Sequence, residues 1–263
     1  MTVCIAVACQ DHGEPRIVLC SDSRLDFGEL GSLSNANKFD ILGAGWTALI
    51  AGDWTAAPYF CGIVKGLISN KRPDSVERVY ACIKTSIKKY LASQVYAEGR
   101  PVGLIVSGFV GSAPQIITVA NNPPTSEEFE ISMSKNAMSA IGSGNSIANV
   151  LLTARECHAL MPLPSAAYAV YEAKKCSEKS GAVGSKTIMV IQSPMNQETL
   201  YSGSLKIMNP LGIVCLDGVW GAMWKQPLSD LPELPSDCFF TAEEIQHLQS
   251  TTTASTPPPP SQE

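Results

Sequence analysis

The chain begins with two apolar runs that are separated by a polar block, a pattern that predicts a β-hairpin. Residues 2–9 and 16–22 are two apolar, β-branched runs, and a cluster of turn-forming residues separates them. Folded about this cluster, Thr2 falls opposite Asp22 or Ser23. Facing residues of an antiparallel pair have Cβ atoms about 4.5–5.5 Å apart. The hairpin alone is therefore expected to bring Asp22 to Thr2.

A second hairpin is predicted over residues 37–51. Its two arms are apolar runs, and Gly43-Ala44-Gly45 forms the turn between them. Folded about the middle of that turn, Lys38 falls opposite Ala51 and next to Gly52. A charged residue and a glycine are thus expected together at one end of this strand pair.

The rest of the pattern alternates between helical and strand periodicity. Apolar residues spaced by three and four predict helices, and short β-branched runs predict strands. The predicted elements are helices over 55–70 (with Asp53 as N-cap) and 73–97, strands over 102–110, 114–120, 127–132 and 137–141, helices over 145–160 and 165–179, and a strand over 186–192. Segregated runs of this kind indicate an α+β protein in which helices pack outside a pair of sheets.

Three segments are expected in the chain. Residues 2–208 form the main domain, and 209–250 form an extension that packs on or beside it. The tail 251–263 contains four consecutive prolines and is predicted to be disordered.

Composition narrows the function. A hydrophobic content of 45% is enough for a sizeable core, whereas a net charge of −5 without a basic patch argues against a nucleic-acid partner. No apolar run reaches the length of a membrane span, and the start lacks the basic residues of a signal peptide. The nine cysteines are scattered singly, which favours reduced thiols and a cytoplasmic location. The three histidines lack zinc-ligand spacing, so neither a metal nor a cofactor is expected.

The candidate chemistry is that of an N-terminal threonine. Removal of Met1 would leave Thr2 with a hydroxyl nucleophile and a free α-amine as its base; no pro-segment precedes it in the sequence, so this step alone is expected to suffice. Lys38 would lower the pKa of that amine from about 7.7–8.0 by like-charge repulsion, and Asp22 would keep the lysine charged. The N–H of Gly52, just before a helix, would stabilise a developing oxyanion.

The spacing of these residues resembles that of a known family. Lys38 follows Asp22 by sixteen residues, and Gly52 follows Lys38 by fourteen. Later, Gly142-Ser143-Gly144 opens a predicted helix and Ser180-Gly181 closes another. This combination is similar to proteasome β subunits and their bacterial proteasome-like relatives, which are N-terminal nucleophile hydrolases.

The resemblance covers roughly residues 2–193 and implies a four-layer αββα sandwich. The site that it implies consists of the nucleophile Thr2, Lys38 near its amine, Asp22 holding Lys38, the oxyanion-hole N–H of Gly52, and the hydroxyls of Ser143 and Ser180 around the amine. One position departs from the family's pattern: Ser177 stands where an acidic residue usually lies three before the serine.

The first functional hypothesis is a threonine-type peptidase that forms an ester on Thr2 and then hydrolyses it. The family implies a ring-like homo-oligomer, peptide or unfolded-protein substrates and an ATP-dependent unfoldase as a candidate partner. The alternatives are an amidase that acts on a small amide and a catalytically inactive scaffold subunit. The complete set of Thr2, Asp22 and Lys38 argues against the scaffold, whereas the sequence leaves peptide and small amide open.

Overall fold

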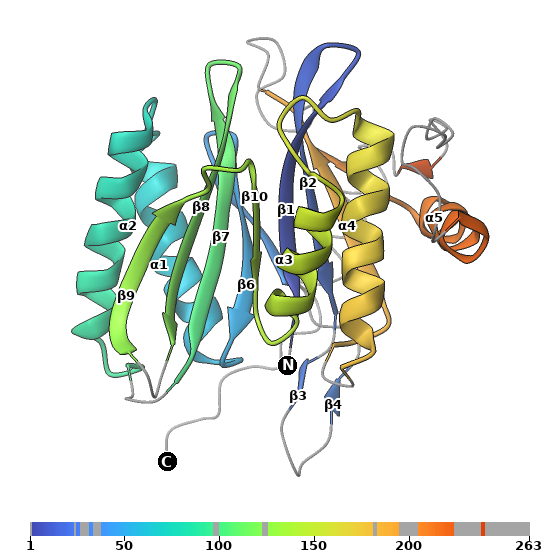
Figure 1. Ribbon diagram of the computed structural model, residues 1–263. Coiled ribbons are helices and arrows are strands. Elements are labelled where there is room, and N and C mark those ends of the chain that lie inside the picture. The colour runs from blue at the N-terminus through green and yellow to red at the C-terminus, as the bar shows by residue number, and fades with distance from the viewer. Residues whose placement is uncertain are drawn as a thin grey trace.

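The computed structural model contains two five-stranded antiparallel sheets and five helices among the residues that it describes (Figure 1). The described residues are 2–23, 25–26, 32–33, 38–96, 100–122, 126–180, 183–194, 205–223 and 238–239. The chain is therefore α+β, as the sequence predicts.

The first sheet has the beginning of the chain near its centre, in the order β10-β1-β2-β11-β12. Its strands are β1 (Cys4–Asp11), β2 (Glu14–Asp22), β10 (Met138–Ile141), β11 (Thr187–Gln192) and β12 (Leu205–Ile207). A separate two-stranded ribbon follows β2 and is formed by β3 (Leu25–Asp26) and β4 (Ser32–Leu33).

The second sheet follows the order of the sequence, β5-β6-β7-β8-β9. Its strands are β5 (Phe39–Gly43), β6 (Trp46–Gly52), β7 (Val102–Val110), β8 (Ala113–Asn122) and β9 (Ser126–Met133). The helices are α1 (Ala56–Lys71), α2 (Val76–Leu91), α3 (Asn145–Ala154), α4 (Leu163–Glu178) and α5 (Pro210–Met223).

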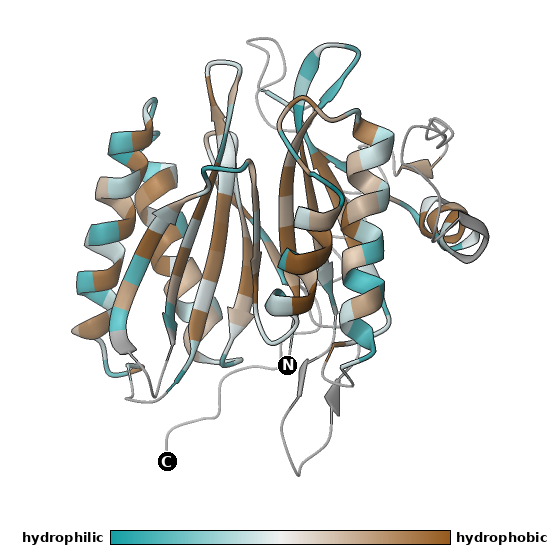
Figure 2. Ribbon diagram, viewed as in Figure 1, coloured by the Kyte–Doolittle hydropathy of each residue, from teal (hydrophilic) through white to brown (hydrophobic). Residues whose placement is uncertain are grey.

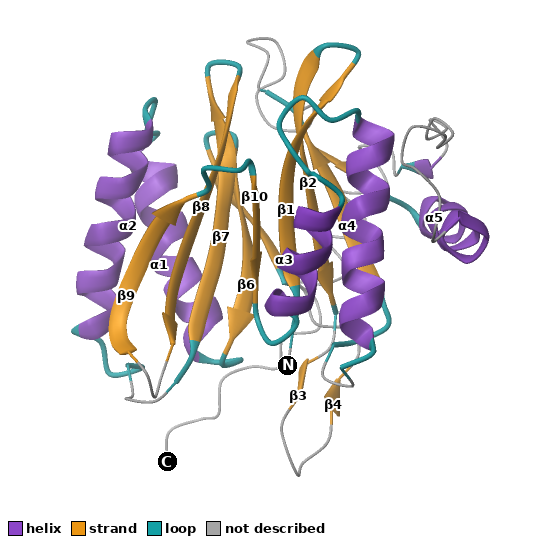
Figure 3. Ribbon diagram, viewed as in Figure 1, coloured by secondary structure: helices purple, strands orange, loops and turns teal. Residues whose placement is uncertain are grey.

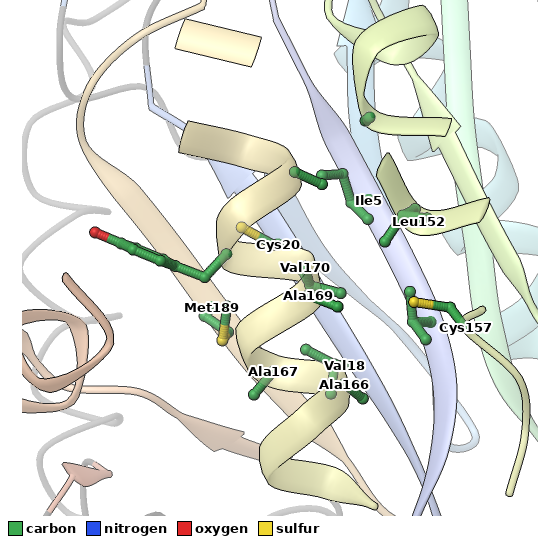
Figure 4. Packing of buried hydrophobic residues seen from close by; sticks show 14 of the residues in the cluster. Ile5, Val18, Cys20, Leu152, Cys157, Ala166, Ala167, Ala169, Val170 and Met189 are labelled. Atoms are coloured by element: carbon green, nitrogen blue, oxygen red, sulfur yellow. The ribbon is translucent and has the colours of Figure 1, made fainter. Parts of the chain in front are cut away.

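Three buried hydrophobic clusters show how these elements pack. The first sheet packs against α3 and α4 in one cluster (Figure 4), the two sheets pack against each other in another, and the second sheet packs against α1 and α2 in the third. Representative members are Ile5, Val18, Leu152 and Val170 in the first, Leu19, Leu49 and Ile105 in the second, and Phe60, Ile83 and Val106 in the third. This packing, with helices outside the strands (Figure 3), is consistent with a sandwich.

Strand β1 is buried on both faces, which explains its unbroken apolar sequence. Val3, Ile5 and Val7 lie in the cluster with the helices, whereas the alternate residues Cys4 and Ala6 lie between the sheets. A strand covered on both sides needs no polar face. Figure 2 shows the resulting hydrophobic colouring along β1.

The first hairpin is confirmed, with a tighter turn than predicted. Asp11 pairs with Glu14, so the turn consists of His12 and Gly13 alone. Both have positive φ, 50° and 84°, which is the conformation of a two-residue hairpin turn whose twist matches that of the strands. At the other end Cys4 pairs with Ser21, and this register brings the first residues of the chain to Asp22.

The second hairpin is also confirmed, but its predicted register is wrong by one residue. Gly43 pairs with Trp46, whereas Ile41 pairs with Thr47, so the register shifts between them. Such a bulge adds one residue to one strand. As a result the N–H of Ile50, rather than that of Ala51, donates to the Lys38 carbonyl at 2.8 Å.

Three predicted helix boundaries are wrong, two of them because local backbone chemistry overrides periodicity. Helix α2 begins at Val76 instead of Pro73, since Ser75 is extended and its hydroxyl accepts from the N–H of Arg78. Its last residue is Leu91, short of the predicted 97. Helix α3 ends at Ala154 rather than 160, because the backbone turns to a positive φ of 52° at Glu156.

The predicted N-cap of α1 is wrong by two residues, although the predicted residue, Asp53, still acts at the start of the helix. Thr55 occupies the N-cap position, but the Asp53 carboxylate accepts from the N–H groups of Thr55 and Ala56 at 2.9 and 2.8 Å. Asp53 thus satisfies two backbone donors at the entrance of the helix. Pro58 lies in the first turn, where its missing N–H costs nothing.

The predicted extension contains α5, which docks on α4. The Tyr171 hydroxyl donates to Asp217 at 2.7 Å, and Lys175 lies over the ring of Trp220. The predicted domain boundaries at 208 and 250 stay predictions, and the tail 251–263 lies outside the described residues. Within the described part of the chain, no helix has the length and apolar character of a membrane span.

Candidate active site

Thr2 lies just before β1 and is held by its own backbone. Its N–H donates to Ser143 Oγ at 3.0 Å, and its carbonyl accepts from Ser143 Oγ at 3.2 Å and from the N–H of Gly144 at 3.1 Å. The Ser143 hydroxyl therefore contacts both polar groups of the Thr2 backbone. This fixes the position from which the Thr2 side chain projects.

Gly142 makes this close approach possible. Its φ is +89°, and a Cβ atom there would lie 2.4 Å from the carbonyl oxygen of Thr2. Any residue with a side chain would push Thr2 away, so the glycine is required by space as well as by conformation. The segment between β10 and α3, which sequence analysis groups as Gly142-Ser143-Gly144, is thus built around the first residues of the chain.

Lys38 joins the Thr2 side chain to Asp22. Its Nζ donates to Thr2 Oγ1 and, at 3.0 Å, to Asp22 Oδ1. Lys38 and Asp22 are buried, and Thr2 is only 6% exposed. A buried ammonium needs a charged partner, and Asp22 supplies it. The nucleophile candidate therefore has a cation directly on its oxygen.

Asp22 is itself fixed by backbone donors from two segments. Oδ1 also accepts from the N–H of Val3 at 3.0 Å, and Oδ2 accepts from the N–H of Gly184 at 3.1 Å. Hydrogen bonds to the charged form stabilise a carboxylate that burial would otherwise disfavour. The three groups Thr2, Lys38 and Asp22 thus form one buried, hydrogen-bonded chain.

Gly52 ends β6 at the same end of the molecule as Thr2 (Figure 1). The Cys4 thiol donates to the Ile50 carbonyl at 3.4 Å, which brings the last residues of β6 beside the first residues of β1. Gly52 has a φ of +113°, and a Cβ atom would lie 2.2 Å from the Pro101 carbonyl oxygen. Only glycine fits here. Its N–H as an oxyanion donor stays a prediction.

Ser180 lies two residues after the end of α4. Its hydroxyl donates to the Ser177 carbonyl at 2.8 Å, and Ser177 Oγ donates to the carbonyls of Gly144 and Ala173 at 3.2 and 2.8 Å. Ser177 is the position where the resemblance expects an acidic residue. Here it ties α4 to the segment that holds Thr2. The role of Ser180 near the amine stays a prediction, and Gly181 lies outside the described residues.

Two donor roles in the site escape sequence analysis. Gly184 and Gly144 act through backbone N–H groups, which carry no residue-specific signal, although the sequence does group Gly144 with Gly142 and Ser143. The 180–184 cluster is rich in glycine and serine, but its sequence indicates only the end of a helix. Gly184 can donate to Asp22 because Thr187 pairs with Asp22. This strand pairing connects segments that are far apart in the sequence.

The cysteine closest to this network is not a competing nucleophile. Burial raises the pKa of Cys4, an effect that the positive charge of Lys38 only partly opposes. The thiol therefore stays protonated at neutral pH. Across the described residues, no group of three His, Cys, Asp or Glu side chains is arranged to hold a metal ion.

Two solved structures share this fold. The Anbu (Gly-1) mutant from Hyphomicrobium sp. strain MC1 is 15% identical with a TM-score of 0.63, and covers 89% of this chain and 100% of its own. Eukaryotic HslV from Trypanosoma brucei is 14% identical with a TM-score of 0.55, and covers 73% of this chain and 99% of its own. No protein-family model matches the sequence, and comparison with curated proteins gives no match. At the level of the fold, these likenesses support the proteasome-like resemblance.

Proposed function

We propose that this protein is a threonine-type hydrolase of the N-terminal nucleophile class, with a four-layer αββα fold, and that its substrates are peptides. The observation that carries the proposal is the contact of Lys38 Nζ with both Thr2 Oγ1 and Asp22. A structural lysine needs no hydroxyl partner at the first residues of a chain. A cation at that oxygen favours its deprotonation, and the free α-amine is the base that accepts the proton.

The reaction begins after Met1 is removed and the Thr2 amine is free. The amine accepts the proton of Oγ1, and Oγ1 bonds to the substrate carbonyl carbon. Negative charge then develops on the carbonyl oxygen, where the N–H of Gly52 stabilises it. The C–N bond breaks as the ammonium returns its proton to the leaving amine. Water, deprotonated by the same amine, then hydrolyses the ester and restores Thr2.

Each neighbouring group has a defined task in this scheme. Lys38 favours the free form of the amine and stabilises negative charge as it develops at Oγ1. Asp22 keeps the ammonium in place, and Ser143 orients the amine through its hydrogen bond to the Thr2 nitrogen. Ser180 extends that network through Ser177.

The assembly and location belong to the same proposal. We expect a ring-like homo-oligomer in the cytoplasm that receives unfolded chains from an ATP-dependent unfoldase. The fold likeness to HslV and Anbu supports the search for such partners. Size-exclusion chromatography with light scattering would test the oligomer, and a monomer at all concentrations would contradict it.

The catalytic proposal is tested by intact mass of the purified protein before and after treatment with an electrophilic threonine-protease inhibitor. We expect loss of Met1 and one adduct, which peptide mapping assigns to Thr2. Thr2→Ala should abolish the adduct, whereas Thr2→Ser, which keeps a hydroxyl and an amine, should retain it. Retained Met1 without an adduct, or an adduct that persists in Thr2→Ala, would refute the proposal.

Substrate panels then separate peptidase from amidase. Peptides and acylated small amides are compared at equal concentration, with Thr2→Ala as the blank for each. Turnover of small amides alone would reject the peptidase and keep the nucleophile. An adduct without turnover of either class would favour a scaffold with a vestigial site.

A further inference from the structure

Lys174 is a fully buried lysine that the proposed reaction does not use. It lies in α4, and its exposed fraction is 0%. Removing an ammonium from water costs several kcal/mol unless charged and polar partners replace the solvent. An apolar side chain of similar length would fill the same space without that cost. The partners of Lys174 therefore indicate what the charge does here.

One partner is local and the other is not. Nζ donates to Glu178 Oε1, one turn further along the same helix, and to the Ser185 carbonyl at 2.7 Å. Glu178 neutralises the ammonium within α4. The bond to Ser185 fastens the helix to the segment that leads into β11.

This segment is the one that holds Asp22. Gly184, the residue before Ser185, donates its N–H to Asp22 Oδ2 at 3.1 Å, while Oδ1 of the same carboxylate accepts from Lys38. We propose that Lys174 is a positioning residue for the active site: it anchors Ser185, so that the Gly184 N–H keeps Asp22 oriented toward Lys38. This proposal rests on the proposed function, because it assigns Lys174 a role in the same reaction.

The electrostatics around Cys20 place the lysine close to the end of β2. Burial raises the pKa of this thiol to about 12; Lys174 opposes the increase, whereas Asp22 and Glu178 add to it. The charges of Lys174, Asp22 and Glu178 thus all act on Cys20, which lies two positions before Asp22 in β2. Figure 4 shows Cys20 beside α4. Helix α4, which carries Lys174, thus packs against the strand that delivers the carboxylate to the site.

The neighbouring lysine provides a matched control. Lys175 is on the same turn and also pairs with Glu178, at 3.2 Å, but its other contacts are Asp217 and the ring of Trp220 in α5. Lys174→Met and Lys175→Met each remove one ammonium beside Glu178. Only the first removes the bond to Ser185.

The test measures hydrogen exchange at the Gly184 amide and the rate at which the inhibitor labels Thr2, expressed per labelled site. In Lys174→Met we expect faster exchange at Gly184 and labelling slowed by about 10–100-fold, since small misplacements of catalytic groups have effects of that size. KM for a peptide should change much less than kcat. Lys174→Arg, which keeps a donor for Ser185, should recover part of the rate. Lys175→Met should match the wild type in exchange and labelling.

Three results would overturn the inference. Lys174→Met could exchange and label like the wild type, Lys175→Met could be impaired to the same degree, or the Gly184 amide of the wild-type protein could exchange as fast as an exposed turn. Hydrogen exchange at Gly184 of the wild-type protein needs no variant. It therefore tests the inference even if the Lys174→Met protein fails to fold. Failure of the wild type to label at all would instead reject the proposed function, and the exchange results would still decide whether Lys174 anchors Gly184.

Discussion

Replacement of Asp22 by asparagine removes the negative charge beside Lys38 and nearly preserves the shape of the side chain. The side chains of the two residues are 0% and 5% exposed, so solvent cannot replace the lost partner of the ammonium. The amide oxygen can still accept hydrogen bonds on one side. The NH₂ group replaces the other carboxylate oxygen and there faces a donor, either the N–H of Gly184 or the pair Lys38 and Val3.

The expected loss of stability in Asp22→Asn follows from the burial of the Asp22–Lys38 ion pair. Breaking a buried ion pair by removing one partner costs about 3–5 kcal/mol, whereas an exposed pair contributes about 0–1 kcal/mol. Asp40 and Lys65 form an exposed pair with a similar separation, 2.8 Å against 3.0 Å, and side-chain exposures of 33% and 46%. Asp40→Asn is therefore the matched control. For a chain of this length, a loss of about 3–5 kcal/mol corresponds to about 6–20 °C in Tm for Asp22→Asn.

The stability of both variants is measured by chemical denaturation and by thermal unfolding, each monitored by circular dichroism. A second step combines Asp22→Asn with Lys38→Met, which removes the unpaired charge. Because two neutral groups can pack where one buried charge cannot, this double variant should regain much of the lost stability without regaining Thr2 labelling. Equal losses for Asp22→Asn and Asp40→Asn would refute the reasoning, as would a double variant less stable than Asp22→Asn.

Three further outcomes follow from the geometry and from burial. Gly142→Ala should slow inhibitor labelling at least about tenfold, because its Cβ atom would clash with the backbone of the nucleophile; Gly111→Ala, also at a positive φ but with open space around the Cβ atom, should label normally, and equal losses in both would point to backbone strain alone. Burial raises the pKa of Cys20 and Cys157 to about 12, and Cys215 is the exposed cysteine of the nine. A thiol reagent at pH 8 should therefore modify one cysteine in the folded protein and nine in denaturant. Between pH 9 and 12 the unfolded chain ionises its thiols while the folded chain keeps them protonated, so the free energy of unfolding should fall with rising pH; a flat stability curve, or rapid modification of several thiols, would contradict this.

Local sequence chemistry predicts the hairpins and the meeting of Thr2 with Asp22. Antiparallel pairing about a short turn leaves few alternatives, because the turn fixes the register of the two strands. The turn residues themselves are less well predicted. The tight turn needs a positive φ at His12, which residues other than glycine rarely adopt, and the bulge after Ile41 has no fixed residue pattern.

The parts of the site that sequence analysis misses are backbone groups and long-range contacts. Gly184 reaches Asp22 because β11 pairs with β2, strands that are more than 160 residues apart in the chain. No local pattern reports such a pairing. Lys174 shows the converse problem: on a helix a lysine usually indicates a solvated face, and only tertiary packing reveals that this one is buried.

The bulge between Ile41 and Gly43 limits which insertions and deletions this protein can accept during evolution. Hairpin turns far from an active site usually tolerate changes in length. Here the turn sets the register of β5, and β5 delivers Lys38 to Thr2. Loss of one residue at the turn would reverse the face of every side chain before it, or move the lysine one position along its partner strand. Related chains that have the proposed activity should therefore conserve the length of this turn even where its residues differ.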